Sequence, residues 1–209
     1  GETMTLMIPD FYGGSSNREV GPKSKMAESM RSNGIPEETI TQFTSQPLPF
    51  IYWGDQPFTS GPVYVGAIVM FLFVLGLLIV KGPLKWWLLT ATVLSVMLAW
   101  GHNFMAFTDF FLEYIPGYNK FRAVTMILVI AEFAIPLLGM LALKEIADGK
   151  QERKKIWNNL LIAAGITAGT CLFFIAFPSM FLSFAGPGDA NIMRQYQFPD
   201  WLMQAIRDD

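Results

Sequence analysis

The sequence predicts an all-α membrane protein, a polytopic helical bundle of about four transmembrane helices with extracytoplasmic loops and interfacial helices. Of its residues, 52% are hydrophobic and 15% are charged, whereas soluble domains carry about 25% charged residues. The apolar residues are gathered into four blocks, each long enough to cross a hydrocarbon core of about 30 Å as a helix. Lysine and arginine concentrate in two of the connections between these blocks.

The four blocks define a transmembrane region at residues 62–182, with spans at about 62–80, 84–104, 123–143 and 156–177. The first block contains no charged residue, and Pro62 is expected in its first helical turn, where proline needs no amide donor. The fourth block contains Gly165 and Gly169, at a spacing that lets helices approach closely in lipid.

The second block is flanked by residues that favour a membrane interface. Trp86 and Trp87 lie near its start and Trp100 near its end, as in an aromatic belt. Lys85 can extend its ammonium group from the apolar region to the interface.

The distribution of basic residues predicts the orientation. Seven of the fifteen lysines and arginines lie in two short connections, namely Lys81, Lys85, Lys144, Lys150, Arg153, Lys154 and Lys155. Because cytoplasmic loops are enriched in these residues, we expect both connections in the cytoplasm. Residues 1–61, 101–122 and 183–209 are then outside the cytoplasm.

The two outer ends of the chain differ in composition from the spans. Residues 1–61 form an extracytoplasmic loop segment rich in Gly, Pro and Ser, in which KMAESMRSN favours a short helix. Residues 183–209 form an extracytoplasmic juxtamembrane segment that ends in FPDWLMQAIRDD. This ending predicts an amphipathic helix whose Trp201, Leu202 and Ile206 rest on the membrane or on another domain.

Residues 102–122 are predicted to form an interfacial segment. On a helix over residues 102–114, three polar residues share one side, and five aromatic residues take the other: His102, Asp109 and Glu113 against Phe104, Phe107, Phe110, Phe111 and Tyr114. Two interpretations are open. The polar residues are a solvated face, or they line a cleft at the outer leaflet.

Two cations, Lys120 and Arg122, follow a Pro-Gly turn at the outer end of the third span. Arginine offers a bidentate fork for phosphate and lysine a point charge, so this pair is a candidate anion site. The alternatives are contact with lipid headgroups and an ion pair to Asp109 or Glu113.

Glu132 is a candidate intramembrane polar residue in the third span. A carboxylate at that depth costs roughly 2.5–3.5 kcal/mol on insertion scales, so it normally faces protein or water. Pro136 removes the amide that would bond the carbonyl of Glu132 and predicts a kink. Glu132 either lines a cavity at this kink or is protonated and bonded to a neighbouring helix.

Several common functional motifs do not occur in the sequence. With one histidine and one cysteine, the chain has no cluster at metal-ligand spacing, so no metal site is predicted. It has no P-loop, no GxGxxG and no GxSxG. No basic stripe suggests nucleic acid as a partner. Cys171, within an apolar run, is interpreted as a packing residue.

Three stretches resemble the YfhO-like bacterial membrane protein family: ETMTLMIPDFYGG, YWGDQPFTSGPVYVGA, and WGHNF followed by YIPGYNKFR. Family members resemble the GT-C glycosyltransferases, which take a sugar from a polyprenyl-phosphate carrier on the outer face of the membrane. The resemblance implies a central fragment of a longer multi-pass protein of the bacterial cytoplasmic (inner) membrane, with a role in the cell envelope. The catalytic acid of GT-C enzymes lies in an early outer loop, so the catalytic residue of this chain is unknown and the resemblance leaves open whether it is an enzyme.

The resemblance also predicts roles for the outer polar residues. Lys120 and Arg122 are expected to hold the donor phosphate, and His102, Asp109 and Tyr118 to contact sugar or acceptor. In the family pattern a proline and a second arginine follow Phe121-Arg122; here residues 123–126 are AVTM, with Lys120 as a substitute cation.

The expected donor is a polyprenyl-phosphate-linked sugar; no cofactor is evident, and a divalent metal is neither indicated nor excluded. Expected partners are membrane lipid, the lipid-linked sugar and the remainder of the parent polypeptide. Two alternatives remain: a transporter or flippase for a lipid-linked or anionic substrate, using Glu132, and a non-catalytic membrane assembly protein.

Overall fold

The computed structural model of the chain describes residues 3–13, 19–46, 52, 63–116, 118–120, 124–149, 151–177 and 199–208. Within these ranges every regular element is helical and no strand occurs, which confirms the all-α prediction. The chain divides into two compact units. Unit 1 comprises Gly1–Ile8 and Val63–Phe177, and unit 2 comprises Pro9–Pro62 and Pro178–Asp209.

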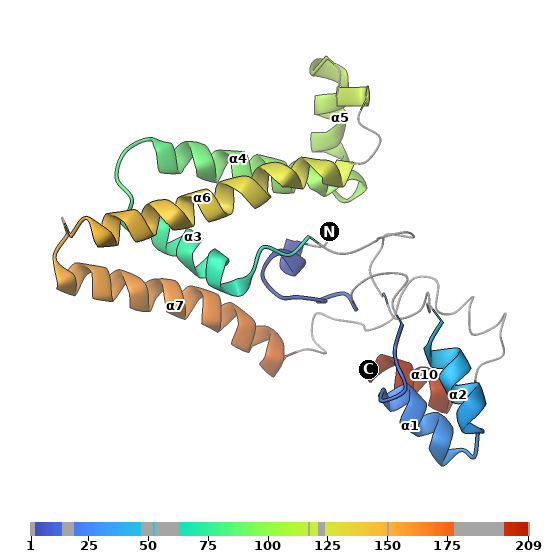
Figure 1. The fold of residues 1–209 in the computed structure, drawn as a ribbon. Coiled ribbons are helices and arrows are strands. Elements are labelled where there is room, and N and C mark those ends of the chain that lie inside the picture. Colours follow the sequence, from blue (N-terminus) through green and yellow to red (C-terminus); the bar gives the residue numbers. More distant parts are fainter. Residues whose placement is uncertain are drawn as a thin grey trace. The chain divides into compact units, whose positions relative to one another are not determined.

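Unit 1 is built on four helices that coincide with the four apolar blocks (Figure 1). They are α3 (Ala67–Ile79), α4 (Leu84–Ala99), α6 (Leu128–Ala147) and α7 (Arg153–Ala176). Helix α6 packs against both α3 and α4, and α3 also packs against α7. Among the described helices, α7 alone is long and apolar enough to cross a membrane, while α3 and α4 are apolar but shorter.

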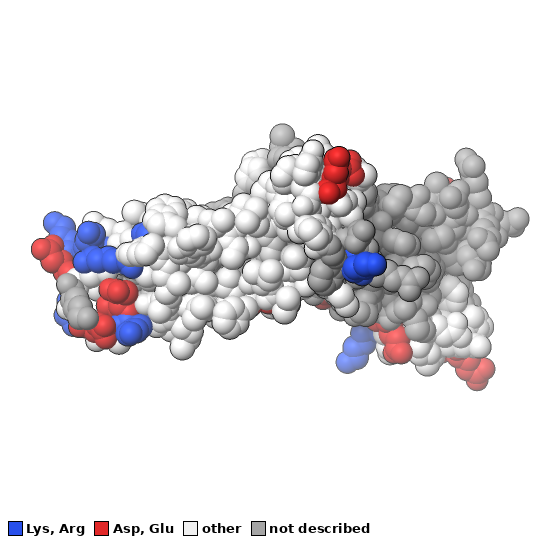
Figure 2. All heavy atoms as spheres, turned by 90° about the horizontal axis from the view of Figure 1, so that it is seen from above, with Lys and Arg blue, Asp and Glu red and all other residues white. Residues whose placement is uncertain are grey.

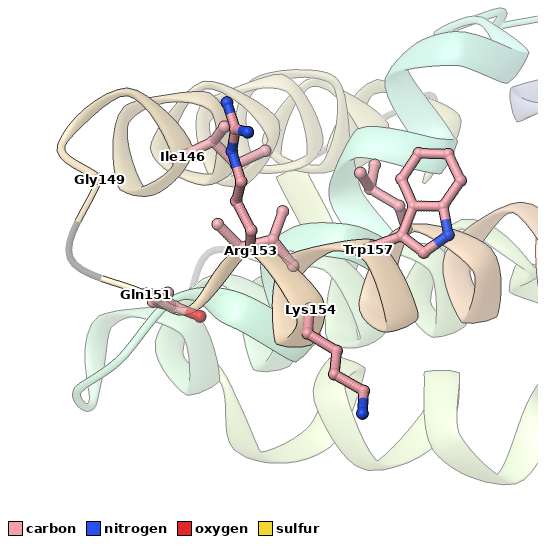
Figure 3. A pocket seen from close by; sticks show the side chains of 8 residues that line it. Ile146, Gly149, Gln151, Arg153, Lys154 and Trp157 are labelled. Atoms are coloured by element: carbon pink, nitrogen blue, oxygen red, sulfur yellow. The ribbon is translucent and has the colours of Figure 1, made fainter.

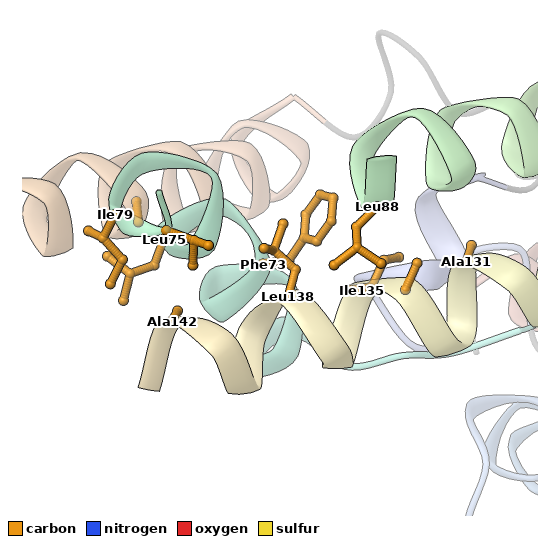
Figure 4. Close-up of a cluster of buried hydrophobic side chains, with 11 residues drawn as sticks. Phe73, Leu75, Ile79, Leu88, Ala131, Ile135, Leu138 and Ala142 are labelled. Carbon is orange, nitrogen blue, oxygen red and sulfur yellow. The ribbon is translucent and has the colours of Figure 1, made fainter. Parts of the chain in front are cut away.

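Buried side chains from all four of these helices form the core of unit 1, with Ala163 contributed by α7. Figure 4 shows Phe73 and Leu75 of α3 beside Ile135 and Leu138 of α6, with Leu88 contributed by α4. Large apolar side chains also cover the outer surface of the helices, and Figure 2 shows a long uncharged stretch with charged groups at either end of it.

Helix α3 begins later than the sequence predicts. Pro62 was expected in its first turn, but the helix starts at Ala67. The amides of Val65 and Gly66 both donate to the carbonyl of Leu6, at 3.1 and 3.2 Å. Gly66 has a φ of +112°, which is incompatible with a right-handed helix. The start of α3 is therefore set by a contact with the N-terminal segment.

Two glycines allow α3 and α6 to cross at close range. A Cβ atom on Gly76 would lie 2.7 Å from both the carbonyl oxygen and Cγ of Leu138. A Cβ atom on Gly139 would lie 3.0 Å from Cβ of Leu72. Neither position has room for a larger residue, so the pair fixes how closely these helices approach.

The two glycines for which the sequence predicted a close helix contact, Gly165 and Gly169, make no such contact. Gly165 and Gly169 of α7 are exposed, and a Cβ on either would meet no atom within 4 Å. The close contact expected from them is therefore not made within this unit. It is made by Gly76 and Gly139 instead.

The far end of α3 is capped by two side chains, one from the first turn of α4 and one from the α6–α7 connection. Lys85 Nζ donates to the carbonyl of Leu77 at 2.9 Å, and Gln151 Nε2 donates to the carbonyl of Ile79 at 2.9 Å. These carbonyls have no partner within the helix, so both bonds satisfy groups that would otherwise need water. The start of α4 and the α6–α7 turn are thereby tied to the same helix end.

Unit 2 is a small cluster of three helices: α1 (Lys25–Ser32), α2 (Glu37–Thr44) and α10 (Asp200–Arg207). Helices α1 and α10 were predicted, but α2 was not. The Ser24 side chain caps α1 by accepting from the Ala27 amide at 3.1 Å. Arg31 of α1 donates from Nε to Glu37 Oε2 at 2.9 Å and also bonds Glu37 Oε1, which joins α1 to α2.

The core of unit 2 combines residues from both ends of the chain. Its buried members are Met26, Ala27, Met30, Ile40, Leu202, Met203 and Ile206. The apolar face of α10 was predicted to rest on the membrane or on another domain. In the structure Leu202 and Ile206 of this face pack with α1 and α2. Segments expected as two separate outer regions form one folded unit.

Candidate functional site

The candidate site lies at the corner where α4 gives way to α5 (Met105–Tyr114). A 3₁₀ turn over Gly101–Phe104 links the two helices. The buried hydroxyl of Thr108 donates to the carbonyl of Gly101 at 2.9 Å and lies 3.3 Å from that of Phe104. Trp100 Nε1 donates to Thr3 Oγ1 at 2.6 Å, which ties the corner to the N-terminal segment.

An aromatic ladder runs along this corner and is defined by five residues: Trp100, Phe104, Phe107, Phe111 and Tyr118. Successive ring centroids lie 6.3, 5.5, 4.9 and 5.7 Å apart. These separations are within the range of favourable aromatic pairs. The ladder therefore holds the segment after α5 against the helix.

The polar residues of α5 lie away from the ladder. Asp109 and Glu113 are one turn apart and both are exposed. His102 was expected on the same face of one helix over residues 102–114, but it lies in the 3₁₀ turn, which breaks the helical phase at Phe104. The side chain of His102 lies outside the described part of the structure.

Tyr118 and Lys120 lie in a 3₁₀ turn after α5. The Tyr118 ring packs on Phe111, and its hydroxyl is shielded from solvent and has no hydrogen-bond partner within the described part of the chain. Burial raises the pKa of this hydroxyl, so it stays protonated at neutral pH and can act as a donor. A buried hydroxyl without a partner is unfavourable, so this group is a candidate to bind a ligand.

Lys120 is exposed and forms no ion pair with Asp109 or Glu113, all three of which the structure describes. The alternative in which its charge is neutralised by these carboxylates is therefore not observed. Arg122 lies outside the described residues, so its pairing with Lys120 stays a prediction.

Glu132 is exposed on α6, beside the exposed side chains of Val129 and Phe133. Helix α6 continues as one element through Pro136. Glu132 therefore does not face the core of unit 1. It also does not line the cavity that the structure forms at the α6–α7 turn.

That cavity, of about 770 Å³, was missed in the sequence (Figure 3). It combines Arg153 and Lys154 with Trp157 and aliphatic side chains. The sequence showed the basic cluster, but it did not show that α6 and α7 leave a hollow beside it.

Within the part of the chain that the structure describes, no group of three or more His, Cys, Asp or Glu side chains is placed to hold a metal ion. Comparisons of the chain with protein-family models, curated proteins and solved structures give no match.

Proposed function

We propose that this chain is a membrane-embedded part of a glycosyltransferase-like protein that binds a polyprenyl-phosphate-linked sugar at the outer face of the membrane. The observation that carries this proposal is the end of the aromatic ladder. There, the unpartnered hydroxyl of Tyr118 lies two residues before the exposed, unpaired ammonium of Lys120. Aromatic surface, a neutral donor and a cation suit a ligand with an apolar chain, a sugar and a phosphate.

The membrane placement is supported by the outer surface of unit 1. Helix α7 has 24 residues and, at about 1.5 Å per residue, is longer than the hydrocarbon core of a bilayer. Its outward side chains include Ile162, Ile166, Leu172 and Ile175, all exposed. Contiguous apolar surface of this kind is unusual in a protein surrounded by water.

Hydroxyl groups in the long helices also suit an apolar surrounding. Thr92, Thr167 and Thr170 each donate to the carbonyl four residues earlier, at 2.8–2.9 Å. Ser95 donates to the carbonyl of Thr92 at 2.9 Å. These four hydroxyls therefore have acceptors within their own helices, which is the arrangement expected of threonine and serine in lipid.

The composition of unit 2 supports an even number of membrane crossings. Lys25–Thr44 and Asp200–Arg207 share a core, so both must lie on the same side of any membrane. Crossings by α3, α4, α6 and α7 satisfy this requirement. With the basic α3–α4 and α6–α7 turns in the cytoplasm, unit 2 and α5 would be outside.

The proposal is tested by sugar transfer in membranes that contain the full-length protein, with the polyprenyl-phosphate-linked sugar as the varied substrate. We expect Lys120→Ala to raise the donor KM about tenfold, because a charge-assisted hydrogen bond contributes about 1.5–3 kcal/mol. Tyr118→Phe should raise it less. Lys23→Ala is the matched control, since it removes an exposed lysine from unit 2.

An unchanged donor KM in both Lys120→Ala and Arg122→Ala would contradict the proposal. Glu132→Gln separates it from transport. A transporter that uses this carboxylate should lose its activity, whereas a transferase acting at the corner after α4 should keep it. Sugar transfer that is independent of the protein would favour an assembly role instead.

A further inference from the structure

The cavity at the α6–α7 turn lies far along the chain from the proposed donor site and has no role in it. It is open to solvent, and its walls come from the end of α6 and the first two turns of α7 (Figure 3). Gln151 forms part of the wall, and its bond to the Ile79 carbonyl at 2.9 Å ties the turn to α3. Gly149, with a φ of +64°, allows the reversal between the helices.

One side of the cavity is basic. In Figure 3 the side chain of Arg153 extends toward Ile146 of α6, while that of Lys154 extends in the opposite direction from the start of α7. Both are exposed, and neither forms an ion pair or hydrogen bond with another side chain. The guanidinium of Arg153 is therefore free to bind a ligand.

The start of α7 adds partial positive charge to the same place. The side chain of its N-cap residue, Glu152, accepts no hydrogen bond from the helix. The backbone amides of Lys155 and Ile156 donate to the carbonyl of Glu152, at 3.0 and 3.1 Å. The amides of Arg153 and Lys154, which precede them, have no hydrogen-bond acceptor among the described residues. Unbonded amides at a helix start favour an anion.

The remaining wall is apolar and aromatic. Ile146, Ile156 and Leu160 line it, and Trp157 lies one helical turn after Arg153. The Trp157 ring is 63% exposed. An arginine, a tryptophan and an aliphatic wall in one hollow suit a ligand that joins an anion to a hydrocarbon chain.

The net positive charge of the whole turn also favours an anionic ligand. Residues 144–155 carry five cations, Lys144, Lys150, Arg153, Lys154 and Lys155, against three carboxylates, Glu145, Asp148 and Glu152. Glu145 Oε2 lies 3.5 Å from Gln151 Nε2, the same atom that donates to the Ile79 carbonyl of α3.

We propose that this cavity binds a phosphate group, presented either by an anionic phospholipid headgroup or by a soluble phosphate compound, with Arg153 as its principal ligand. The apolar wall favours the phospholipid. The inference rests on the membrane placement proposed above, which sets this turn at the cytoplasmic interface, where anionic lipids are found.

The test uses the whole chain purified in a neutral detergent and titrated with short-chain phosphatidylglycerol, with bound lipid counted by native mass spectrometry. Diacylglycerol with the same acyl chains is the ligand control, because it lacks only the phosphate-containing headgroup. We expect Arg153→Gln to raise the Kd for phosphatidylglycerol about tenfold, and Trp157→Ala about threefold. Lys144→Gln removes an exposed cation from the same turn without touching the cavity wall, and should change the Kd less than about twofold.

Equal losses in Lys144→Gln and Arg153→Gln would overturn the site, because they would mean diffuse attraction by the whole turn. Equal binding of diacylglycerol would overturn it as well. Displacement of the lipid by inorganic phosphate would support a soluble phosphate as the natural ligand, and resistance to it would support the phospholipid. Alkaline extraction of native membranes tests the membrane placement separately: release of the chain would refute that placement without affecting the binding result.

Discussion

The two units of this protein treat apolar side chains in opposite ways. Unit 2 encloses Met26 and Ile40 completely, at 0% exposure, and presents mostly polar residues of α1 and α2 to its surroundings. Unit 1 leaves Ile68, Trp87 and Ile175 exposed by 76, 72 and 74%. Its interior also buries large side chains such as Leu75 and Leu138, but small residues, Gly76 and Gly139, set the distance at which α3 and α6 cross.

This contrast is what two different surroundings would demand. In water, burial of apolar area is the main favourable term, so a small domain such as unit 2 must hide its large side chains. In lipid that term is absent between helices, and close approach at small residues takes its place. Substitution of the same type of residue should therefore change the stability of the two units by different amounts.

The largest expected effect is in the core of unit 2. Ile40→Ala should destabilise this unit by about 2–5 kcal/mol, because the side chain is fully buried and the small core has little means to close the space. Hydrogen exchange of the full chain should show faster exchange in residues 25–44 and 200–207 together, with α6 unchanged. Glu38→Ala, on the exposed face of the same helix, is the control. Loss of protection in only one of the two segments would refute a shared core.

A lysine on the outer face of α7 tests the surroundings of unit 1 directly. Ile166 is 51% exposed, so Ile166→Lys would cost less than about 0.5 kcal/mol in water. In lipid it should cost roughly 2.5–3.5 kcal/mol and reduce membrane insertion, as measured by alkaline extraction. Gln42→Lys in unit 2 should insert normally. Normal insertion and stability of Ile166→Lys would remove the distinction between the units.

A smaller effect on stability is expected at two glycines, one at the crossing of α3 and α6 and one on the exposed face of α7, where alanine should act in opposite directions. Gly76→Ala should destabilise unit 1 by about 1–3 kcal/mol, because the added methyl would collide with the backbone of Leu138. Gly165→Ala meets open space and should stabilise α7 by about 0.5–1 kcal/mol. Thermal unfolding of both variants in detergent compares them. Equal shifts in Tm would mean that α3 and α6 do not approach closely at Gly76.

The smallest effect is the response of unit 2 to acid. Hydrogen bonds from Arg31 hold the pKa of the Glu37 carboxyl below its ordinary value. Because the folded pKa is lowered, the stabilisation is present above the unfolded pKa, about 4.3, and is lost as pH falls through the folded value. Hydrogen exchange of α1 and α2 below pH 5 should show this decline. Glu37→Gln should be less stable at neutral pH and lack that part of the dependence.

The sequence predicted individual helices better than their partners. Composition located the four apolar helices, and amphipathic patterns located α1 and α10. Contacts between distant segments were not visible, because periodicity reports which face of a helix is apolar and not what covers it. The start of α3 depends on Leu6, and the position of Gly76 matters only because Leu138 crosses it.

The candidate site was predicted in part for the same reason. The sequence indicated Tyr118 and Lys120, and the structure adds the ring contact with Phe111 and the unpartnered hydroxyl. The single helix expected over residues 102–114 is instead a 3₁₀ turn followed by α5, since residue type over four positions does not distinguish a 3₁₀ turn from an α-helix. The cavity beside Arg153 depends on the separation of two helices, which no local pattern encodes.

The composite core of unit 2 has a consequence for biosynthesis. Its first two helices are synthesised before α10, which follows about 155 residues later, a delay of roughly 8–30 s at typical elongation rates. Throughout that interval Met26 and Ile40 lack the α10 side chains Leu202, Met203 and Ile206 that complete their core. The apolar faces of α1 and α2 therefore stay partly uncovered while the intervening helices are synthesised, and unit 2 can complete its core only after α10 has been made.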